Sequence, residues 1–425
     1  MDSLLAKLEQ TIAGKGILIT EKDQLMPYLR GTEGLSTFAE KTRQLLAAIK
    51  VSDVTLIYDL VDLANQLTTK ENKPFVLYPI CSGRNWGYNT SQPAAKISNA
   101  IILDLSELTK IELDKELGLL TIEPGVTQKQ LSEYLIDQGD EYMVPVTGAG
   151  PDCAIVSNAL ERGYGITPCQ DHFAAVTAIK GVWGSGKRFT SAISELDDSS
   201  QNMIDKTFKW GLGPYLDGLF TQSNFGIVTE MSLRLAYRRP GFISFFVQIK
   251  NDNDLEKVVP IIQQTLRDYE GIVGSINLMD KRRVISMFAD NPNGKANHIT
   301  MSDQDVENAA RKLDTPSWTV VGSIYGTEAI AKTAKQEIKA LFKQLDCKMI
   351  FSDSLVIKLG EKVLNKLPNF AIGMSEKLSV AKEQIDSFAK GKEIMLGKPN
   401  RVALKLAYWR NPNTLKEDDI LSPGK

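Results

Sequence analysis

The sequence predicts an α+β protein of more than one domain, and three observations support this fold class. The first is the length of 425 residues, which exceeds the usual size of a single domain. The second is Arg-Arg-Pro-Gly at 238–241, a breaker-rich stretch typical of a domain boundary. The third is a strand, helix and strand order that occurs twice after residue 241 and indicates an antiparallel sheet covered by helices. We expect domains at 1–239 and 240–425.

Composition and charge exclude several classes of function. Lys and Arg (50) nearly balance Asp and Glu (52), so no basic surface for nucleic acid or anionic lipid is expected. The N-terminus lacks the pattern of a secretion signal, and no apolar run is as long as a membrane span. Four scattered cysteines and only two histidines, His172 and His298, argue against a metal site. We expect a cytoplasmic protein without a metal.

Hydrophobic periodicity and capping residues define the elements of the first domain. Asp53 is a good N-cap, and Thr127 with Gln130 has the spacing of a capping box before a helix that ends at Gly139. The strand that begins at Phe75 is expected to stop at Pro79. The expected order is helix 3–12, strand 17–19, helix 53–67, strands 75–78, 101–105, 111–113 and 119–122, helix 127–139, a hairpin at 176–190 and a strand at 225–235.

The loop at 79–88, Pro-Ile-Cys-Ser-Gly-Arg-Asn-Trp-Gly-Tyr, follows this strand. Its glycines stand beside Ser82, Arg84 and Asn85, so backbone N–H groups can converge on an anion. The stretch therefore fits a loop that holds phosphate. An ordinary glycine-containing turn would use the same residues, and this stretch alone leaves both interpretations open.

A second glycine-rich region spans 144–168 and contains Gly148, Gly150, Gly163 and Gly165. Small residues let the backbone approach a flat or extended ligand closely. A block of strands and a helix separates the two glycine-rich regions along the chain. We expect the two regions to hold one ligand from two sides.

Two nucleotide-binding fingerprints fail on single residues. Residues 148–150 begin like a dinucleotide-binding motif, but Cys153 stands at the third glycine position and Pro151 intervenes. Residues 181–187 have phosphate-loop spacing, but Arg188 replaces the Ser or Thr that would bind magnesium. A hairpin with the turn Gly-Ser-Gly is the better interpretation of this stretch.

The second domain is expected to begin with a strand and then a helix capped by Asp254. The lysine-rich stretch at 377–392 is typical of a solvated helix and loop, and implies no partner. The expected order is strand 242–247, helix 254–266, strand 318–321, a helix containing 330–345, strand 349–351 and strand 402–409.

Residues 83–88 resemble the vanillyl-alcohol oxidase and para-cresol methylhydroxylase family of flavoproteins. Further stretches agree with that family in the same order, namely 122–127, 158–163, 164–173 and the long segment 213–229. The resemblance is strong over residues 50–240 and weaker at 322–326 and 407–411. It implies an FAD-binding domain of two subdomains with the cofactor between them, followed by an α+β cap domain that covers the isoalloxazine ring.

The resemblance also implies an activity. Family members oxidise para-hydroxybenzylic substrates by hydride transfer to N5 of FAD, and Tyr88 matches a tyrosine that binds the substrate phenolate. We expect an FAD-dependent oxidase or dehydrogenase for a small phenolic or benzylic alcohol, with Tyr88 as the catalytic candidate. The residues expected to bind FAD are Pro79, Ile80, Cys81, Ser82, Gly83, Arg84, Asn85, Pro145, Thr147, Gly148, Asn158, Gly163, Gly165, Ile166 and, near the adenine, Ile227.

The chain departs from the family pattern at three places. Val146 stands where the oxidases often have an Asp, although Asp152 lies on the same loop. No histidine precedes His172, so the base that assists histidyl flavin attachment in some members is missing, and His172 itself is expected to be structural. The chain ends at Lys425, where the family continues, so we expect the cap to be incomplete at its C-terminus. The alternatives are a fragment, a homo-oligomer or partner subunit that supplies the missing part, and a catalytically degenerate flavin-binding subunit.

Overall fold

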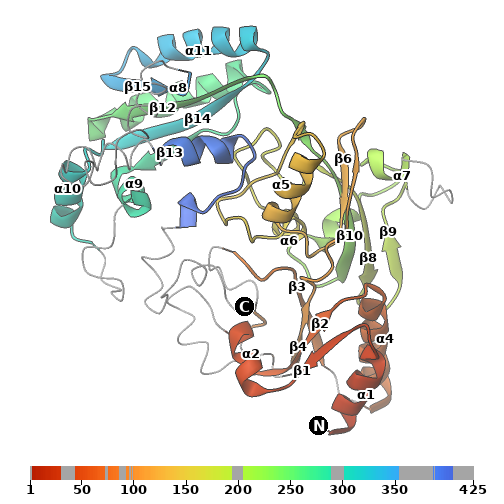
Figure 1. Cartoon of the computed structure of the whole chain (residues 1–425). Coiled ribbons are helices and arrows are strands. Elements are labelled where there is room, and N and C mark those ends of the chain that lie inside the picture. Colours follow the sequence, from red (N-terminus) through yellow and green to blue (C-terminus); the bar gives the residue numbers. More distant parts are fainter. Residues whose placement is uncertain are drawn as a thin grey trace.

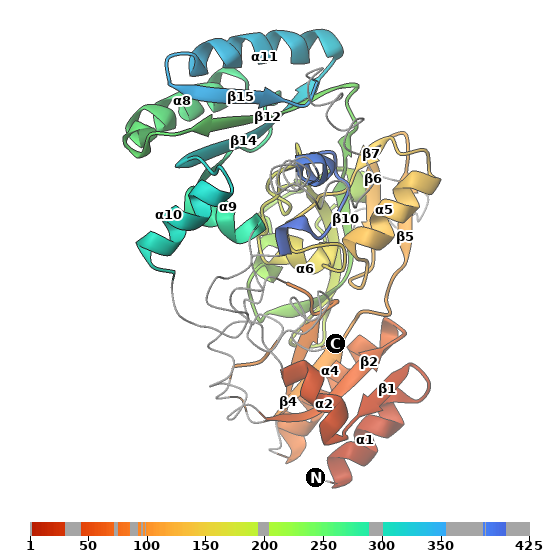
Figure 2. The ribbon, with the colours of Figure 1, turned by 60° about the vertical axis from the view of Figure 1, so that its left-hand side comes forward.

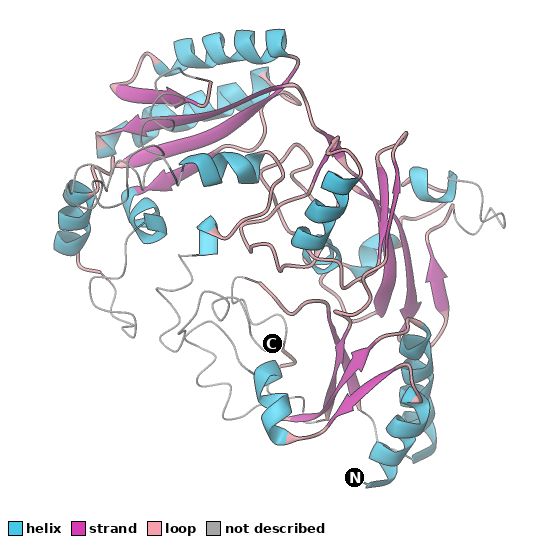
Figure 3. Ribbon diagram, viewed as in Figure 1, coloured by secondary structure: helices cyan, strands magenta, loops and turns pink. Residues whose placement is uncertain are grey.

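The computed structural model describes residues 2–29, 44–71, 75–85, 92–94, 97, 99–193, 204–288, 301–353, 386 and 388–404. Within these residues the strands form three sheets of four or five strands and one two-stranded pair. Figure 1 shows the chain running from a first sheet near its N-terminus, through a second, to a third at the opposite end. Helices accompany each of the three large sheets (Figure 3), and most strand pairs are antiparallel, which confirms the expected α+β class. None of the described helices has the length and apolarity needed to cross a membrane.

The first sheet is built from α1 (Asp2–Ile12), β1 (Gly16–Ile19), α2 (Lys22–Leu29), β2 (Leu45–Val51), α4 (Thr55–Glu71), β3 (Val76–Ile80) and β4 (Ala100–Asp104). Its strand order is β1-β2-β4-β3, with β1 antiparallel and the others parallel. Leu56, Ile57 and Leu60 of α4 are fully buried against one face. Asp53 begins α4 as expected, since its Oδ1 accepts a 2.8 Å hydrogen bond from the N–H of Thr55.

The expectation that the strand before the first loop stops at Pro79 is wrong. Pro79 lies within β3, opposite Leu103 of β4, and the strand continues to Ile80. Among the described strands β3 pairs only with β4, so it is an edge strand, and a sheet edge tolerates a residue without an N–H. The first loop therefore begins at Cys81.

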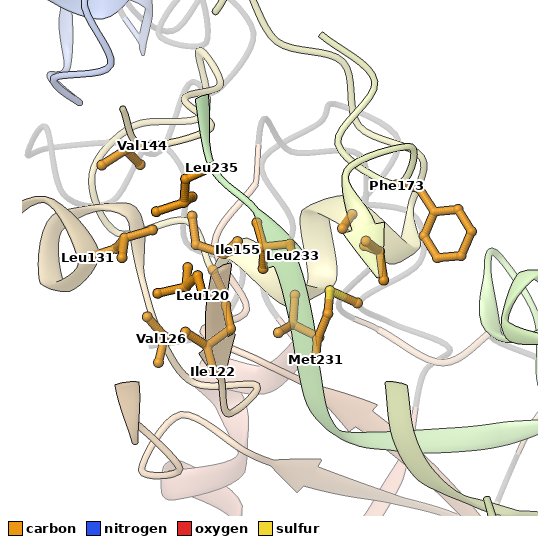
Figure 4. Close-up of a cluster of buried hydrophobic side chains, with 14 of the residues drawn as sticks. Leu120, Ile122, Val126, Leu131, Val144, Ile155, Phe173, Met231, Leu233 and Leu235 are labelled. Atoms are coloured by element: carbon orange, nitrogen blue, oxygen red, sulfur yellow. The ribbon is translucent and has the colours of Figure 1, made fainter. Parts of the chain in front are cut away.

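The second sheet is built from β5 (Ile111–Asp114), β6 (Leu119–Ile122), α5 (Gln128–Asp137), α6 (Ile155–Leu160), β8 (Val176–Trp183), β9 (Arg188–Thr190) and β10 (Gly226–Arg234). Its antiparallel order is β5-β6-β10-β8-β9. Figure 4 shows the core, where Leu131 of α5 and Ile155 of α6 pack against strand residues such as Leu120 and Leu233. Shorter elements are β7 (Tyr142–Met143), α7 (Ile204–Thr207), η2 (Asp217–Phe220) and β11 (Ala236–Tyr237).

The stretch with phosphate-loop spacing is a hairpin, as expected. Lys180 of β8 lies opposite Thr190 of β9, and Val182 lies opposite Arg188. Gly186 occupies the turn with φ of +85°, a left-handed conformation that favours glycine.

The third sheet is built from β12 (Gly241–Ile249), η3 (Asp252–Asp254), α8 (Leu255–Asp268), β13 (Asn277–Asp280), α9 (Lys281–Phe288), α10 (Asp303–Lys312), β14 (Trp318–Gly326), α11 (Glu328–Phe342) and β15 (Cys347–Phe351). Its order is β13-β14-β12-β15, antiparallel throughout. Figure 2 shows α8 and α11 on the same side of this sheet, where Phe245 and Phe342 are fully buried. The expected antiparallel sheet covered by helices is confirmed, while the boundary at 239–240 stays a prediction.

Asp254 occupies the N-cap position of α8 as expected, but its side chain makes no capping hydrogen bond. Its backbone lies at φ −78° and ψ 0° rather than in the extended conformation of a capping residue, and its carboxylate accepts from Nζ of Lys257 at 2.8 Å. The expectation of a strand that begins at residue 402 is wrong. Residues 402–404 form the 3-10 helix η4 (Val402–Leu404) rather than the start of a strand, and 405–409 lie outside the described residues. Leu404 is buried and lies against Gly150, so its apolar side chain is covered by a loop rather than by a sheet.

Candidate cofactor site

The first loop, residues 81–85, leaves β3 with backbone donors available to a ligand. Gly83 has φ of +69°, and the Ser82 side chain is buried with its Oγ accepting from the N–H of Arg84 at 3.4 Å. Within the described residues, the N–H groups of Ser82 and Gly83 have no hydrogen-bond partner. Successive N–H groups around a left-handed residue form a concave site for an anion.

Tyr88, the expected catalytic residue, lies outside the described residues, so its role stays a prediction. Gln92 follows shortly after it and is only 4% exposed. Neither amide atom of Gln92 has a partner among the described residues. A buried amide is costly unless something binds it, so Gln92 marks a position where a ligand or another part of the chain completes the structure.

Gln128 holds the second glycine-rich region in place, and sequence reasoning missed it. Its side chain is buried, and Nε2 donates to Oγ1 of Thr147 at 3.1 Å and to the carbonyl of Gly150 at 2.9 Å. Its Oε1 accepts from the N–H of Thr147 at 2.9 Å. The expected capping box of Thr127 and Gln130 is confirmed and places Gln128 at the first position of α5. That position, directly after a cap, was the signal that could have identified it.

Asn158, Gly163 and Gly165, all expected to bind FAD, lie together around His172. Oδ1 of Asn158 is hydrogen-bonded to Nδ1 of His172, and the N–H of Gly163 donates to the carbonyl of Asn158 at 2.8 Å. Burial lowers the pKa of His172 to about 4, against a smaller opposing effect of Asp171, so the imidazole is neutral at neutral pH. The burial of His172 and its bond to Asn158 agree with the expected structural role, which stays a prediction.

The two glycine-rich regions meet in one core. Cys81 from the first loop belongs to the same buried cluster as Val144, Val146 and the residues of α6, and Ile166 packs against that cluster. Burial raises the pKa of the Cys81 thiol to about 12 and that of Cys153 to about 11, despite hydrogen bonds that favour the thiolates. Both thiols therefore stay protonated and unreactive.

Ile227 is not brought to these loops. It belongs to the buried cluster of the first sheet, with Val182 and residues of α4, whereas the next residue, Val228, belongs to the core of the second sheet. Its assignment to the adenine end of FAD stays a prediction.

The C-terminal described segment, 388–404, ties the third sheet to the second glycine-rich region. Arg401 forms a 2.8 Å ion pair with Asp152, so the carboxylate of Asp152 is directed to Arg401. Tyr325 of β14 places its hydroxyl 2.5 Å from the carbonyl oxygen of Met395 and 3.4 Å from that of Ile166. Both contacts fix the cap relative to residues that were expected to line the cofactor.

A cavity of about 260 Å³ lies elsewhere, between β9 and residues 209–217. Its walls include Phe189, Trp210 and Tyr215, with Lys209 and Asp217 beside them. None of the residues expected to bind FAD lines this cavity. It is therefore separate from the candidate cofactor site.

The residues of the two loops fit FAD. A pyrophosphate needs convergent donors, and the N–H groups of Ser82 and Gly83 are unpartnered among the described residues. Oγ1 of Thr167, in the second region, is likewise buried without a described partner. A flat ring system needs small residues beside it, and the second region supplies them.

Comparison with known proteins agrees with FAD as the cofactor. Residues 58–190 match the FAD binding domain family. The chain is 30% identical to 1'-carboxy-chondrochloren decarboxylase of Chondromyces crocatus over 79% of this chain and 60% of that protein. It is 26% identical to the 4-cresol dehydrogenase (hydroxylating) flavoprotein subunit of Pseudomonas putida, over 85% of this chain and 68% of that protein.

Solved structures show the same fold. p-Cresol methylhydroxylase with substrate bound superposes with a TM-score of 0.77 at 22% identity, covering 97% of this chain and 73% of that one. The isoeugenol complex of 4-ethylphenol oxidase from Gulosibacter chungangensis gives a TM-score of 0.76 at 20% identity, covering 96% and 72%.

The chain thus spans about 60% to 68% of the length of the two curated relatives. The matched domain, these relatives and the shared fold agree with one another. The chain is similar to flavoproteins of the vanillyl-alcohol oxidase and para-cresol methylhydroxylase family, and the matched domain indicates FAD as its cofactor.

Proposed function

We propose that the protein is an FAD-dependent oxidoreductase that oxidises a small aromatic substrate, a phenolic or benzylic alcohol. The observation that carries the proposal is the meeting of the two glycine-rich regions in one core, with the N–H groups of Ser82 and Gly83 unpartnered among the described residues. The names of the similar structures, p-cresol methylhydroxylase and 4-ethylphenol oxidase, support a phenolic substrate.

FAD, when bound, would supply the hydride acceptor for the oxidation. The N–H groups of residues 82–85 would hold its pyrophosphate, in line with the left-handed turn at Gly83. The backbone of the second region would lie along the rest of the cofactor, from Pro145, Thr147 and Gly148 to Ile166. The cap would exclude water and orient the substrate, and Tyr88 would bind the phenolate.

The test is a flavin spectrum followed by substrate reduction. The purified protein should be yellow, and an anaerobic panel of para-substituted phenols and benzylic alcohols should bleach the flavin. Tyr88→Phe should weaken phenol binding about tenfold or more, through loss of a hydrogen bond to a charged group, and leave the Kd for FAD unchanged. Colourless protein that takes up no added FAD contradicts the proposal. FAD binding without bleaching by any compound supports the degenerate flavin-binding subunit instead.

A second candidate reaction is oxidative decarboxylation, favoured by the 30% identical relative that is named a decarboxylase. In that reaction the substrate would still lose a hydride to FAD, and carbon dioxide would leave the adjacent carbon while the electrons of the broken C–C bond form a carbon–carbon double bond. Adding para-hydroxyphenyl carboxylic acids to the panel separates the two candidates. Bleaching with release of carbon dioxide supports decarboxylation, whereas bleaching by alcohols and alkylphenols alone supports the first proposal.

An assembly is part of the proposal, because the Pseudomonas putida relative is described as a flavoprotein subunit. The partner would be a second copy or another subunit. Light scattering of the purified chain gives its mass and so distinguishes a homo-oligomer from a monomer that awaits a different subunit.

A further inference from the structure

A buried pair of side chains, Asn158 and His172, lies beneath the loop at 163–166. Asn158 comes from α6 and His172 from the segment that follows the loop, and Oδ1 of Asn158 is hydrogen-bonded to Nδ1 of His172. The loop closes around this pair, since the N–H of Gly163 donates to the carbonyl of Asn158 at 2.8 Å and that of His172 to the carbonyl of Gly163 at 3.2 Å. The two side chains therefore set the path of the backbone between them.

The pair also explains why the loop has glycine at 163. A Cβ on Gly163 would overlap the carboxamide of Asn158, with Cγ only 2.5 Å away, and the three nearest atoms all belong to that side chain. Gly163 does not have a left-handed φ, so its conformation alone does not call for glycine. The space beside its Cα is taken by the protein's own side chain.

Gly165 repeats the arrangement with the other member of the pair. A Cβ there would overlap Nε2 of His172 and would lie 2.7 Å from the carbonyl oxygen of Val146. Gly165 also lacks a left-handed φ. Because Val146 contributes backbone as well, removing the imidazole alone would not open this position. Gly163 is therefore the sharper of the two places to test the pair.

The hydrogen bond orients His172. Since Oδ1 of Asn158 can only accept, Nδ1 of His172 carries the proton and Nε2 carries the lone pair. Nε2 is buried, has no partner among the described residues and lies against Gly165. The neutral imidazole of His172 is thus held in one orientation and packs against the loop at Gly165.

We propose that Asn158 and His172 are positioning residues that set the 163–166 loop for FAD, and that residue 163 is glycine because of Asn158 and not because FAD lies against it. The inference rests on the proposed placement of FAD at this loop. In this proposal Asn158 does not bind FAD directly, although the sequence predicted that it would. It acts on the cofactor through Gly163 and the backbone that follows.

The test is a double-variant cycle of Gly163→Ala and Asn158→Ala, read by the Kd for FAD from flavin fluorescence. Gly163→Ala alone should weaken FAD binding at least about tenfold, as overpacking moves the loop. Adding Asn158→Ala removes the overlap, so the double variant should bind FAD within about threefold of Asn158→Ala alone. If Gly163→Ala costs the same factor in both backgrounds, FAD itself excludes the methyl group and the proposal is wrong.

Gly184→Ala is the matched control, because a Cβ there would meet only the carbonyl oxygen of Phe225 at an ordinary 3.5 Å. It should leave the Kd for FAD unchanged. If the Gly163→Ala variant binds no FAD at all, the same question is decided by the melting temperatures of four proteins without FAD: the wild type, the two single variants and the double variant. A drop caused by Gly163→Ala that vanishes in the Asn158→Ala background supports the pair, and an equal drop in both backgrounds contradicts it.

His172→Gln gives a readout that stability alone would not move. The visible circular dichroism of bound flavin reports how its ring is held, and it should change in this variant while FAD still binds. An unchanged signal would mean that His172 only stabilises the fold. Failure of the wild-type protein to bind FAD would instead refute the proposed function, so the two failures are distinguishable.

Discussion

At the residue scale, His172 makes the stability of the protein depend on pH. Its pKa is about 4 in the folded protein against 6.5 for an ordinary histidine, so between these pH values the unfolded chain binds more protons. The stability that depends on a neutral His172 is fully present above about pH 6.5. As the pH falls toward 4, the free energy of unfolding decreases by up to about 3 kcal/mol.

Urea unfolding of wild type and His172→Gln at several pH values between 7.5 and 4.5 measures this contribution. The unfolding free energy of the wild type should fall more steeply with acid than that of the variant, which has no imidazole to protonate. Groups that do not interact with His172 contribute equally to both proteins and cancel in the comparison. Parallel curves would show that His172 is already protonated or accessible in the folded state.

Gln128 and Gln130 offer a matched pair of substitutions in one helix. Gln128→Leu leaves the N–H of Thr147 and the carbonyl of Gly150 without their buried partner, which should lower the unfolding free energy by about 2 kcal/mol and weaken FAD binding. Gln130→Ala breaks only the capping box and should cost about 1 kcal/mol without altering the Kd for FAD. Equal effects on FAD from both variants would show that Gln128 serves α5 and not the loop.

At the scale of the element, the hairpin of β8 and β9 predicts that substitution of Gly186 lowers the stability of the protein and that substitution of its neighbour Lys187 does not. Gly186→Ala forces an L side chain into φ of +85° and should lower the unfolding free energy by about 1 kcal/mol or more. Lys187→Ala should leave stability and FAD binding unchanged, since Lys187 is an exposed residue beyond the turn. In a phosphate loop, Lys187 would bind the nucleotide and its substitution would have the larger effect. If ATP stabilises the wild-type protein but not Lys187→Ala, the hairpin interpretation is contradicted.

The elements themselves were largely predictable, and the exceptions have physical reasons. Strand and helix periods located the segments, and caps such as Asp53 and Thr127 located helix starts, because both depend on residues close in sequence. The end of the strand was wrongly predicted at Pro79, because an edge strand can contain a proline and the position of β3 at the edge depends on the tertiary structure. Asp254 stands at the start of α8 but forms no capping hydrogen bond, because it also ends η3 and so lacks the extended backbone of a capping residue.

At the scale of the whole molecule, Arg238 joins the segment 388–404 to residues 140–142. Its guanidinium donates to the Asp140 carboxylate at 2.8 Å and to the carbonyls of Asp140, Tyr142 and, in the segment 388–404, Leu396. Arg238→Met keeps the aliphatic stem and removes these donors. Hydrogen exchange of residues 388–404 should become at least about tenfold faster, since charge-assisted hydrogen bonds are the strong ones.

Lys398→Met is the control for Arg238→Met. Lys398 also reaches Asp140, but at 3.9 Å and with its side chain 46% exposed, so the pair should contribute little. Exchange in 388–404 should stay at the wild-type rate in this variant. Equal acceleration by both variants would mean that net charge around Asp140, and not the geometry of Arg238, holds the segment.

The sequence by itself determined the fold class, most element positions and the two glycine-rich regions, because periodicity, caps and glycine act within a few residues along the chain. Only the tertiary structure decided how the site is held. Gln128 and Thr147 are 19 residues apart, and Arg401 and Asp152 are 249 apart, so no local pattern links them. It also placed Asn158 against His172 and Gly163, a contact that forms only after α6 and the following segment have packed and on which our proposal for Asn158 rests.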